Sequence, residues 1–160
     1  MGKEVKTNAM RMLERAKVNY TSHEYPHEEG QAVDGAHVAQ LTGQDPAKVF
    51  KTLVTQGADR NYYVFVVPVL AELDLKKAAK SVGVKSVAMI HVADINKVTG
   101  YIRGGCSPVG MKKHYPTFID ETCTLWDEIA VSAGARGHQM IVPPQPLADL
   151  VGAELTDIIV

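Results

Sequence analysis

Residues 49–69 read VFKTLVTQGADRNYYVFVVPV and give the clearest structural signal in the chain. Two segments rich in β-branched and aromatic residues, 49–55 and 62–69, flank the turn-rich hexapeptide QGADRN. This pattern predicts a β-hairpin. Val66 and Val67 make the second arm too apolar for a strand with one face in water, so we expect it to be covered on both faces.

Helices and short strands are predicted around this hairpin. Spaced apolar residues predict an amphipathic helix over 5–18, Asp34 and Gly43 bracket a second helix, and Asp74 and Gly83 bracket a lysine-rich one. The remaining predicted elements are strands at 21–25, 87–90, 117–121, 128–134, 138–144 and 155–160, a short helix or turn at 94–99, and a helix at 146–152. Strands and helices do not alternate strictly. The sequence therefore favours an α+β fold, with a mixed, partly barrel-like sheet flanked by helices, over a doubly wound fold.

Length and composition predict one globular domain over residues 1–160. A domain has ~100–200 residues, and 46% hydrophobic with 22% charged residues excludes disordered, collagenous and coiled-coil classes. No apolar run approaches the ~18 residues of a membrane span, and the first residues lack a signal-peptide block, so we expect a cytoplasmic protein without membrane association. The two cysteines lie seventeen positions apart without a CxxC motif, and the six histidines are scattered. Neither a disulfide framework nor a metal site is expected.

Charge is spread unevenly over the sequence. The formal net charge is −1, yet residues 76–114 contain eight Lys and Arg side chains and one acid, Asp94. A basic middle third in a nearly neutral chain is typical of a protein with one face toward a polyanion. A solvated lysine-rich helix is the alternative interpretation.

Lys51 is an isolated cation within the apolar segment VFKTLV. A strand would place it on the same face as Val49 and Leu53, which both favour burial. Such a lysine either extends its ammonium group to the edge of the sheet or is held in a pocket that binds an anion. The strand pattern leaves both interpretations open.

The segment GGCSPVG at 104–110 must be a loop, and its glycines can turn backbone N–H groups toward a carbonyl oxygen or a phosphate. Its spacing matches no nucleotide-binding motif, and a purely structural turn is the alternative. Cys106 with His114 forms a candidate nucleophile and base, although a lone cysteine is more often a small hydrophobic residue. Ser132 lacks the GxSxG context of a hydrolase nucleophile.

Four motifs together resemble the YbaK family of Cys-tRNA(Pro) deacylases, which are related to the editing domain inserted in bacterial prolyl-tRNA synthetases. These motifs are VFKTLV (49–54), LDLKKAAKSVG (73–83), TGYIRGGCSPVGMKK (99–113) and VSAGARG (131–137), in this order. The resemblance spans nearly the whole chain. It implies a free-standing editing domain with a barrel-like mixed sheet and without a metal or organic cofactor.

The resemblance also implies roles for individual residues. Lys51 of the KTL motif is expected to hold the 3′ end of the tRNA. Gly104 and Gly105 are expected to shape the carbonyl pocket and donate N–H groups to it. Ser132, which opens the SAGxRG motif, and Tyr25, which follows the first helix, are expected to line the same site.

Ser107 and Arg136, within the same motifs, are further expected substrate-binding residues. The chain departs from the family pattern at Ala135, where a lysine is usual, so a cation there is not required. The family also tolerates an aliphatic residue at the position of Cys106. That thiol is therefore not expected to be the nucleophile.

The activity implied by the resemblance is removal of cysteine from Cys-tRNA(Pro), with Cys-tRNA(Cys) as a further substrate. A synthetase pocket separates amino acids of similar size only ~10–200-fold, so a second site must remove the wrong one. In the family the substrate's own thiol attacks its ester. Because a net charge of −1 gives weak tRNA binding, prolyl-tRNA synthetase is the expected partner. The alternatives are a deacylase for another residue such as Ala-tRNA(Pro), a non-catalytic module that binds tRNA or a synthetase, and a thiol hydrolase.

Overall fold

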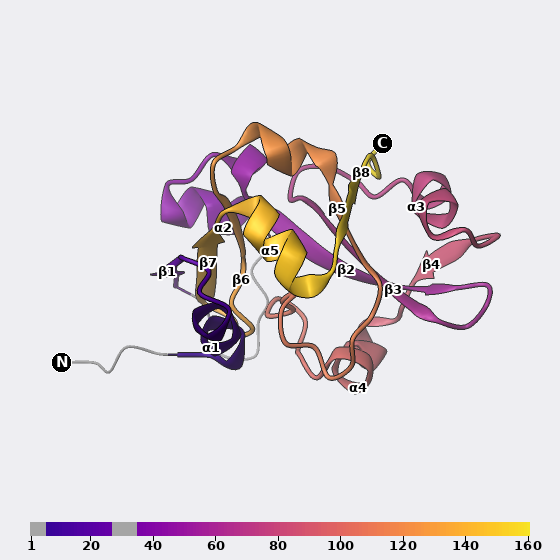
Figure 1. The fold of residues 1–160 in the computed structure, drawn as a ribbon, viewed down its shortest axis with the longest axis horizontal. Helices are drawn as coiled ribbons and strands as arrows, with labels where there is room; N and C mark the ends of the chain where they lie inside the picture. Colours follow the sequence, from indigo (N-terminus) through magenta and orange to yellow (C-terminus); the bar gives the residue numbers. More distant parts are fainter. Residues whose placement is uncertain (1–5, 27–34) are drawn as a thin grey trace.

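The computed structural model describes residues 6–26 and 35–160 and confirms the α+β class (Figure 1). Short helices and strands follow one another in irregular order, as the sequence predicted. Along the chain they are α1 (Asn8–Arg15), β1 (Thr21–Glu24), α2 (Gly35–Thr42), η1 (Pro46–Lys48), β2 (Phe50–Gly57), β3 (Tyr62–Pro68), α3 (Leu75–Val82), β4 (Val87–Met89), η2 (Val92–Asp94), α4 (Ile95–Thr99), β5 (Thr117–Asp120), η3 (Glu121–Leu125), β6 (Ile129–Ser132), β7 (His138–Val142), α5 (Pro144–Val151) and β8 (Glu154–Thr156).

The strands form two sheets. In the larger, mixed sheet the order is β4-β2-β3-β5-β8, with β2 antiparallel to both β4 and β3, and β5 parallel to both β3 and β8. The smaller sheet, β1-β7-β6, is antiparallel. An isolated parallel bridge between Val49 and Ala130 joins the two sheets. Over the ranges that the structure describes, the sheets do not close into a barrel. The expectation of a partly barrel-like sheet therefore holds only for the mixed, curved arrangement of the strands.

The β2–β3 hairpin and the helix ends confirm the local sequence signals. The hairpin register runs from Phe50 opposite Pro68 to Gln56 opposite Tyr62. The carboxylate of Asp74 accepts hydrogen bonds from two backbone N–H groups in the first turn of α3, which ends at Gly83 in the left-handed conformation. The other predicted cap, Asp34, lies outside the described residues.

Several predicted boundaries differ from the structure, and two of these differences have a clear cause. Helix α5 begins at Pro144 rather than at 146, because proline has no N–H to leave unpaired at a helix start. Strand β8 covers only Glu154–Thr156, and the following chain turns so that Ile159 bridges to Leu73 beyond the hairpin. None of the helices described has the length and apolarity to cross a membrane.

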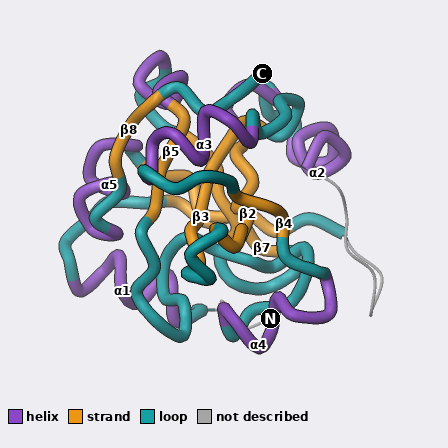
Figure 2. Tube along the Cα trace, turned by 90° about the vertical axis from the view of Figure 1, so that its right-hand side faces the viewer, coloured by secondary structure: helices purple, strands orange, loops and turns teal. Residues whose placement is uncertain are grey.

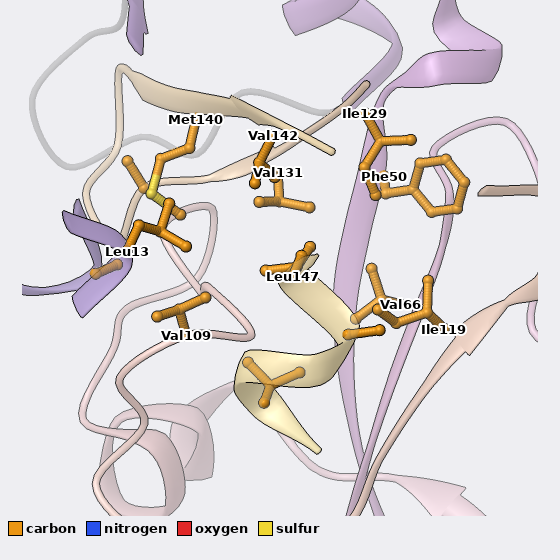
Figure 3. Packing of buried hydrophobic residues seen from close by; sticks show 14 of the residues in the cluster. Leu13, Phe50, Val66, Val109, Ile119, Ile129, Val131, Met140, Val142 and Leu147 are labelled. Atoms are coloured by element: carbon orange, nitrogen blue, oxygen red, sulfur yellow. The ribbon is translucent and has the colours of Figure 1, made fainter. Parts of the chain in front are cut away.

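The main core lies between the two sheets and is closed by α5 and α1. Figure 3 shows Leu147 of α5 between Val131 and Val142 of the small sheet on one side and Val66 and Ile119 of the large sheet on the other. All five side chains are inaccessible to solvent. Burial of a side chain of this size contributes ~1.5–3 kcal/mol. This packing sets the angle between the sheets and hence the space between β2 and β6.

A second core lies under α3. The small faces of Ala78 and Ala79 pack on the large sheet against Phe65 and Phe118, whose rings stack at 5.4 Å. Figure 2 shows α3 and α4 on opposite sides of β4 at this edge of the molecule. The edge strand β4 is therefore bordered by two helices from the basic middle segment of the sequence.

Candidate functional site

A cavity of about 640 Å³ lies where the two sheets meet. Its walls come from β2, β4, β6 and β7, the start of α4, and the glycine loop at 104–110. The parallel bridge between Val49 and Ala130 explains this convergence, because Lys51 and Ser132 each follow it by two residues in the same direction. Four of the expected site residues line this one cavity: Tyr25, Lys51, Gly104 and Ser132.

Lys51 is half-buried and lines the cavity. Its Nζ donates a hydrogen bond of 3.4 Å to the carbonyl oxygen of Val69 on the adjoining chain. Lys51 forms no ion pair with any carboxylate of the described residues. A cation held by one carbonyl and no carboxylate can bind an anionic ligand.

The glycine loop presents one of its two neighbouring glycines to the cavity. Gly104 adopts φ +85°, a left-handed conformation that favours glycine, and the described residues offer its N–H no hydrogen-bond acceptor. Gly105 does not line the cavity, and its N–H donates a 2.9 Å hydrogen bond to the carbonyl oxygen of Ile102. The expectation that both glycines donate to a substrate is therefore corrected: Gly105 closes the turn that directs Gly104.

Ser132 and Tyr25 add hydroxyl groups to the cavity. Ser132 Oγ accepts a 3.2 Å hydrogen bond from the N–H of Gly134, which orients the oxygen and leaves its proton for a ligand. Tyr25 is 8% exposed, and its N–H donates to the carbonyl oxygen of Gly137 at 2.9 Å. Burial raises the pKa of the Tyr25 phenol, so this side chain stays a neutral hydrogen-bond donor at physiological pH.

Ser107 and Arg136 do not line the cavity, in contrast to the expectation that they contact substrate. Ser107 is fully buried, and its Oγ accepts a hydrogen bond from the N–H of Val109 within the loop. The Nε of Arg136 donates a 2.7 Å hydrogen bond to the carbonyl oxygen of Arg103, which precedes Gly104. Both side chains therefore position the glycine loop.

Tyr101 is a third positioning residue, which the sequence did not indicate. Its hydroxyl group donates a 2.5 Å hydrogen bond to the carbonyl oxygen of Val109. A Cβ atom at Gly134 would lie 2.9 Å from the Tyr101 ring, and one at Gly110 would lie 2.9 Å from its hydroxyl oxygen. The loops at 104–110 and 132–137 thus both pack on one aromatic side chain, which requires glycine at these contacts.

Three polar residues of the cavity wall were also missed: Thr52, Arg103 and Gln139. The side-chain oxygens of Thr52 and Gln139 are inaccessible to solvent and have no hydrogen-bond partner in the structure. A buried polar atom left unpaired costs ~1–3 kcal/mol, so these two oxygens are candidate contacts for a ligand that supplies donors. The sequence feature that could have identified two of them is a polar residue inside an apolar strand segment. Thr52 follows Lys51 in VFKTLV, and Gln139 lies within HQMIV.

Cys106 lines the cavity, but its surroundings do not activate it. Burial raises the pKa of this thiol to about 11, against ~8.5 for a free cysteine, so almost no thiolate exists near neutral pH. His114, its candidate base, does not line the cavity. Its ring lies beside Gly152 at the end of α5. The structure therefore does not support the thiol hydrolase.

The electrostatics of the cavity suit an anionic ligand with an apolar part. Among the residues that the structure describes, Lys51 and Arg103 are the cations that line the cavity, and no Asp or Glu lines it. Its apolar wall includes Phe50, Ile90 and Ile95. Within 6–26 and 35–160, no three His, Cys, Asp or Glu side chains form a group that could hold a metal ion.

Comparison with known proteins gives a family match over most of the chain. A model of the aminoacyl-tRNA editing domain matches residues 29–150. A protein of Enterococcus faecalis (strain ATCC 700802 / V583) is 44% identical over 153 residues, which cover 96% of this chain and 93% of its own. That relative is provisionally named Cys-tRNA(Pro)/Cys-tRNA(Cys) deacylase EbsC.

Two solved structures share the fold. A provisionally assigned trans-editing enzyme for prolyl tRNA synthetase superposes with a TM-score of 0.80 at 24% identity, covering 98% of this chain and 99% of its own. The hypothetical protein APE2540 superposes with a TM-score of 0.83 at 18% identity, covering 94% and 97%. The family match covers most of the chain, and the chain therefore belongs to the YbaK family of aminoacyl-tRNA editing domains.

Proposed function

We propose that this protein is a deacylase that removes cysteine from mischarged Cys-tRNA(Pro), and from Cys-tRNA(Cys) as a second substrate. The observation that carries the proposal is a single cavity that combines two unpaired cations, an unpaired backbone N–H and an apolar wall. The name of the 44% identical relative supports the same pair of substrates.

The cations account for binding of the tRNA end. A terminal nucleotide brings a phosphate into the cavity, where Lys51 and Arg103 can neutralise it. This leaves the ester between ribose and amino acid beside the glycine loop. There the N–H of Gly104 can donate to the carbonyl oxygen and stabilise the negative charge that develops on it.

The unpaired oxygens account for recognition of the amino group. The α-ammonium group of an aminoacyl ester carries three donors, and Gln139 Oε1 and Thr52 Oγ1 are buried acceptors without partners. Rotation of these two side chains toward the cavity would let a bound ammonium group restore both missing hydrogen bonds. The side chain of the amino acid then faces the apolar wall.

The reaction needs no nucleophile from the protein. The sulfur of the bound cysteine attacks its own carbonyl carbon, the new carbon–sulfur bond closes a cyclic thioester, and the carbon–oxygen ester bond breaks. The thiol proton passes to the departing ribose oxygen, so tRNA leaves with a free hydroxyl group, and water later opens the thioester to cysteine. The protein contributes orientation and stabilisation of the oxyanion, which suffices because an aminoacyl ester is already activated.

A panel of charged tRNAs tests the substrate. We expect release of amino acid from Cys-tRNA(Pro) and Cys-tRNA(Cys), and at least 100-fold slower release from Ser-tRNA(Pro) and Ala-tRNA(Pro), which carry no thiol. Equal rates for cysteine and serine would reject attack by the substrate's sulfur. Faster release of alanine would assign the protein to a different editing activity, and tight tRNA binding without turnover would make it a binding module.

We further infer that residues 1–160 act as one editing domain in the cytoplasm, together with prolyl-tRNA synthetase. A formal net charge of −1 supports the need for a partner, because affinity for tRNA rises with the number of phosphates that a protein neutralises. The fold shared with a trans-editing enzyme for prolyl tRNA synthetase supports the choice of partner. Added synthetase should lower the KM for Cys-tRNA(Pro) and leave that for Cys-tRNA(Cys) unchanged.

A further inference from the structure

We propose that a groove between α3 and β4 binds the phosphate backbone of the tRNA acceptor stem while the 3′ end occupies the cavity. This inference rests on the proposed function and adds the surface along which the rest of the substrate lies. The groove is a second hollow, of about 280 Å³, and we call it the lysine groove. It is lined by Leu75, Lys76, Ala79, Lys80, Val84, Lys85, Ser86 and Val87.

The lysine groove is an unneutralised cationic surface. Lys76, Lys80 and Lys85 are exposed, and none of them forms an ion pair within the described residues. The neighbouring Lys77 differs, because its Nζ pairs with Asp157 at 2.9 Å and also donates to the carbonyl oxygen of Ile159. On α3, Lys77 is therefore neutralised, whereas Lys76 and Lys80 are not.

The spacing of these lysines costs stability unless an anion approaches from outside. Lys76 and Lys80 are four residues apart on α3, so they lie one turn apart on the same face and repel each other. Lys85, on the far wall of the groove, adds a third charge. A phosphodiester backbone supplies negative charges at regular intervals, which matches three cations around one shallow groove.

Strand β4 connects the lysine groove to the cavity. Lys85, Ser86 and Val87 border the groove, whereas Met89 and Ile90 line the cavity. Met89 follows Lys85 by four residues, so the two are at most about 14 Å apart. Stacked nucleotides of one strand advance about 3.4 Å each, so four nucleotides are enough to cover this path.

Four nucleotides is the length of the unpaired 3′ end of a tRNA. With the terminal ester in the cavity, the lysine groove therefore lies at the first paired phosphates of the acceptor stem. On the other side of β4, near α4, Lys112 donates to the carbonyl oxygen of Lys97, and Lys97 lies 4.0 Å from the carboxylate of Asp94. Those charges are partly satisfied, which favours the α3 side (Figure 2).

The test compares two triple variants with the same change of charge. The variant K76Q/K80Q/K85Q removes the lysine groove cations, and its control R11Q/R15Q/K17Q removes three exposed cations on and after α1, at the other end of the molecule (Figure 1). Each is assayed on Cys-tRNA(Pro) and on the cysteinyl ester of a CCA trinucleotide, which ends before the groove. Binding of uncharged tRNA(Pro) is measured in parallel against salt concentration.

We expect the groove variant to raise the KM for Cys-tRNA(Pro) at least tenfold with kcat unchanged, and to leave the trinucleotide ester unaffected. Its slope of log affinity against log salt should fall by about 2 to 3, the value for three lost phosphate contacts. The control variant should match the wild type in all these measurements. Wild-type KM and salt slope in the groove variant, an equal loss on the trinucleotide, or a loss confined to a K112Q/K113Q variant would each overturn the inference.

The proposed function fails separately. A wild-type protein that binds tRNA(Pro) without releasing cysteine rejects the deacylase assignment. The binding comparison between the two triple variants then still supports or overturns the lysine groove.

Discussion

Arg136 holds Arg103 in place: its Nε donates a 2.7 Å hydrogen bond to the Arg103 carbonyl oxygen, directly before Gly104. The loops at 104–110 and 132–137 are thereby joined, and a Cβ atom built on Gly105 would lie 3.1 Å from the backbone nitrogen of Arg136. The position of the Gly104 N–H thus depends on a residue outside the cavity. Arg136 acts by positioning and not by touching substrate.

Replacing Arg136 by Ala should lower kcat about tenfold with little change in KM. The tRNA contacts remain, but the loop that carries the Gly104 N–H loses a hydrogen bond. Steady-state kinetics and urea unfolding measure the two effects, and we expect the free energy of unfolding to fall by less than about 1.5 kcal/mol, the size of one such bond. A selective rise in KM would instead assign Arg136 to substrate binding.

Replacing Gly134 by Ala should destabilise the protein by about 1–3 kcal/mol or more. Gly134 has φ +94°, and a new Cβ would lie 2.9 Å from the Tyr101 ring. Gly83 is the matched control, since its φ is +85° and a Cβ there meets nothing within 4 Å. The difference between the two variants in thermal unfolding isolates the contact with Tyr101; equal losses would show that only backbone conformation matters.

Replacing Lys51 by Ala should reduce kcat/KM for Cys-tRNA(Pro) at least 100-fold while the protein stays folded. The change removes a cavity cation whose protein contact is a 3.4 Å hydrogen bond to Val69. Lys48→Ala, at an exposed lysine that lies 5.0 Å above the ring of Trp126, serves as the control. A folded, fully active Lys51→Ala protein would refute the proposed role.

Replacing Gln139 by Leu should lower kcat/KM about tenfold or more and leave the protein as stable or more stable. The buried Oε1 has no hydrogen-bond partner, which lowers the stability of the free protein. Only a bound ammonium group would supply the missing hydrogen bond. A 3-mercaptopropionyl ester of tRNA(Pro), which lacks the amino group, should be cleaved equally by both proteins. An equal loss on that ester would disprove recognition of the amine.

Replacing Cys106 by Ala should leave the pH profile of deacylation unchanged. The substrate thiol ionises near pH 8.5, so the rate should rise as pH increases toward that value. The pKa of Cys106 is about 11, so this thiol stays protonated throughout the range and contributes no inflection. Loss of turnover in a stable Cys106→Ala protein would restore the protein-thiol mechanism.

The local structure was largely predictable from the sequence, because its signals are local. The residues of the β2–β3 hairpin and the caps Asp74 and Gly83 act within a few positions of themselves. The parallel pairing of β3 with β5 was not predicted, because a run such as TFID carries no information about its neighbour. The division into two sheets depends on the same long-range pairings.

The site was predictable where a residue type conflicts with its surroundings. Lys51 in an apolar strand is such a conflict, and it does line the cavity. The hydrogen bond from the Gly105 N–H to Ile102 depends on loop geometry, which the residue types do not encode. The same is true of the hydrogen bond from Arg136 to Arg103. Gln139 was hidden because one polar residue in a short strand is common, and only its burial without a partner distinguishes it.

The parallel register of β3 with β5 also bears on how the enzyme is assembled. Val64–Val66 and Thr117–Ile119 lie side by side in the ladder, and the fifty residues between them carry α3, β4, α4 and the glycine loop. Joining these strands closes a long loop, a slow event in folding compared with formation of the hairpin. A chain trapped before this step has its hairpin and no pocket, so recovery of editing activity after dilution from denaturant should lag behind recovery of β-structure.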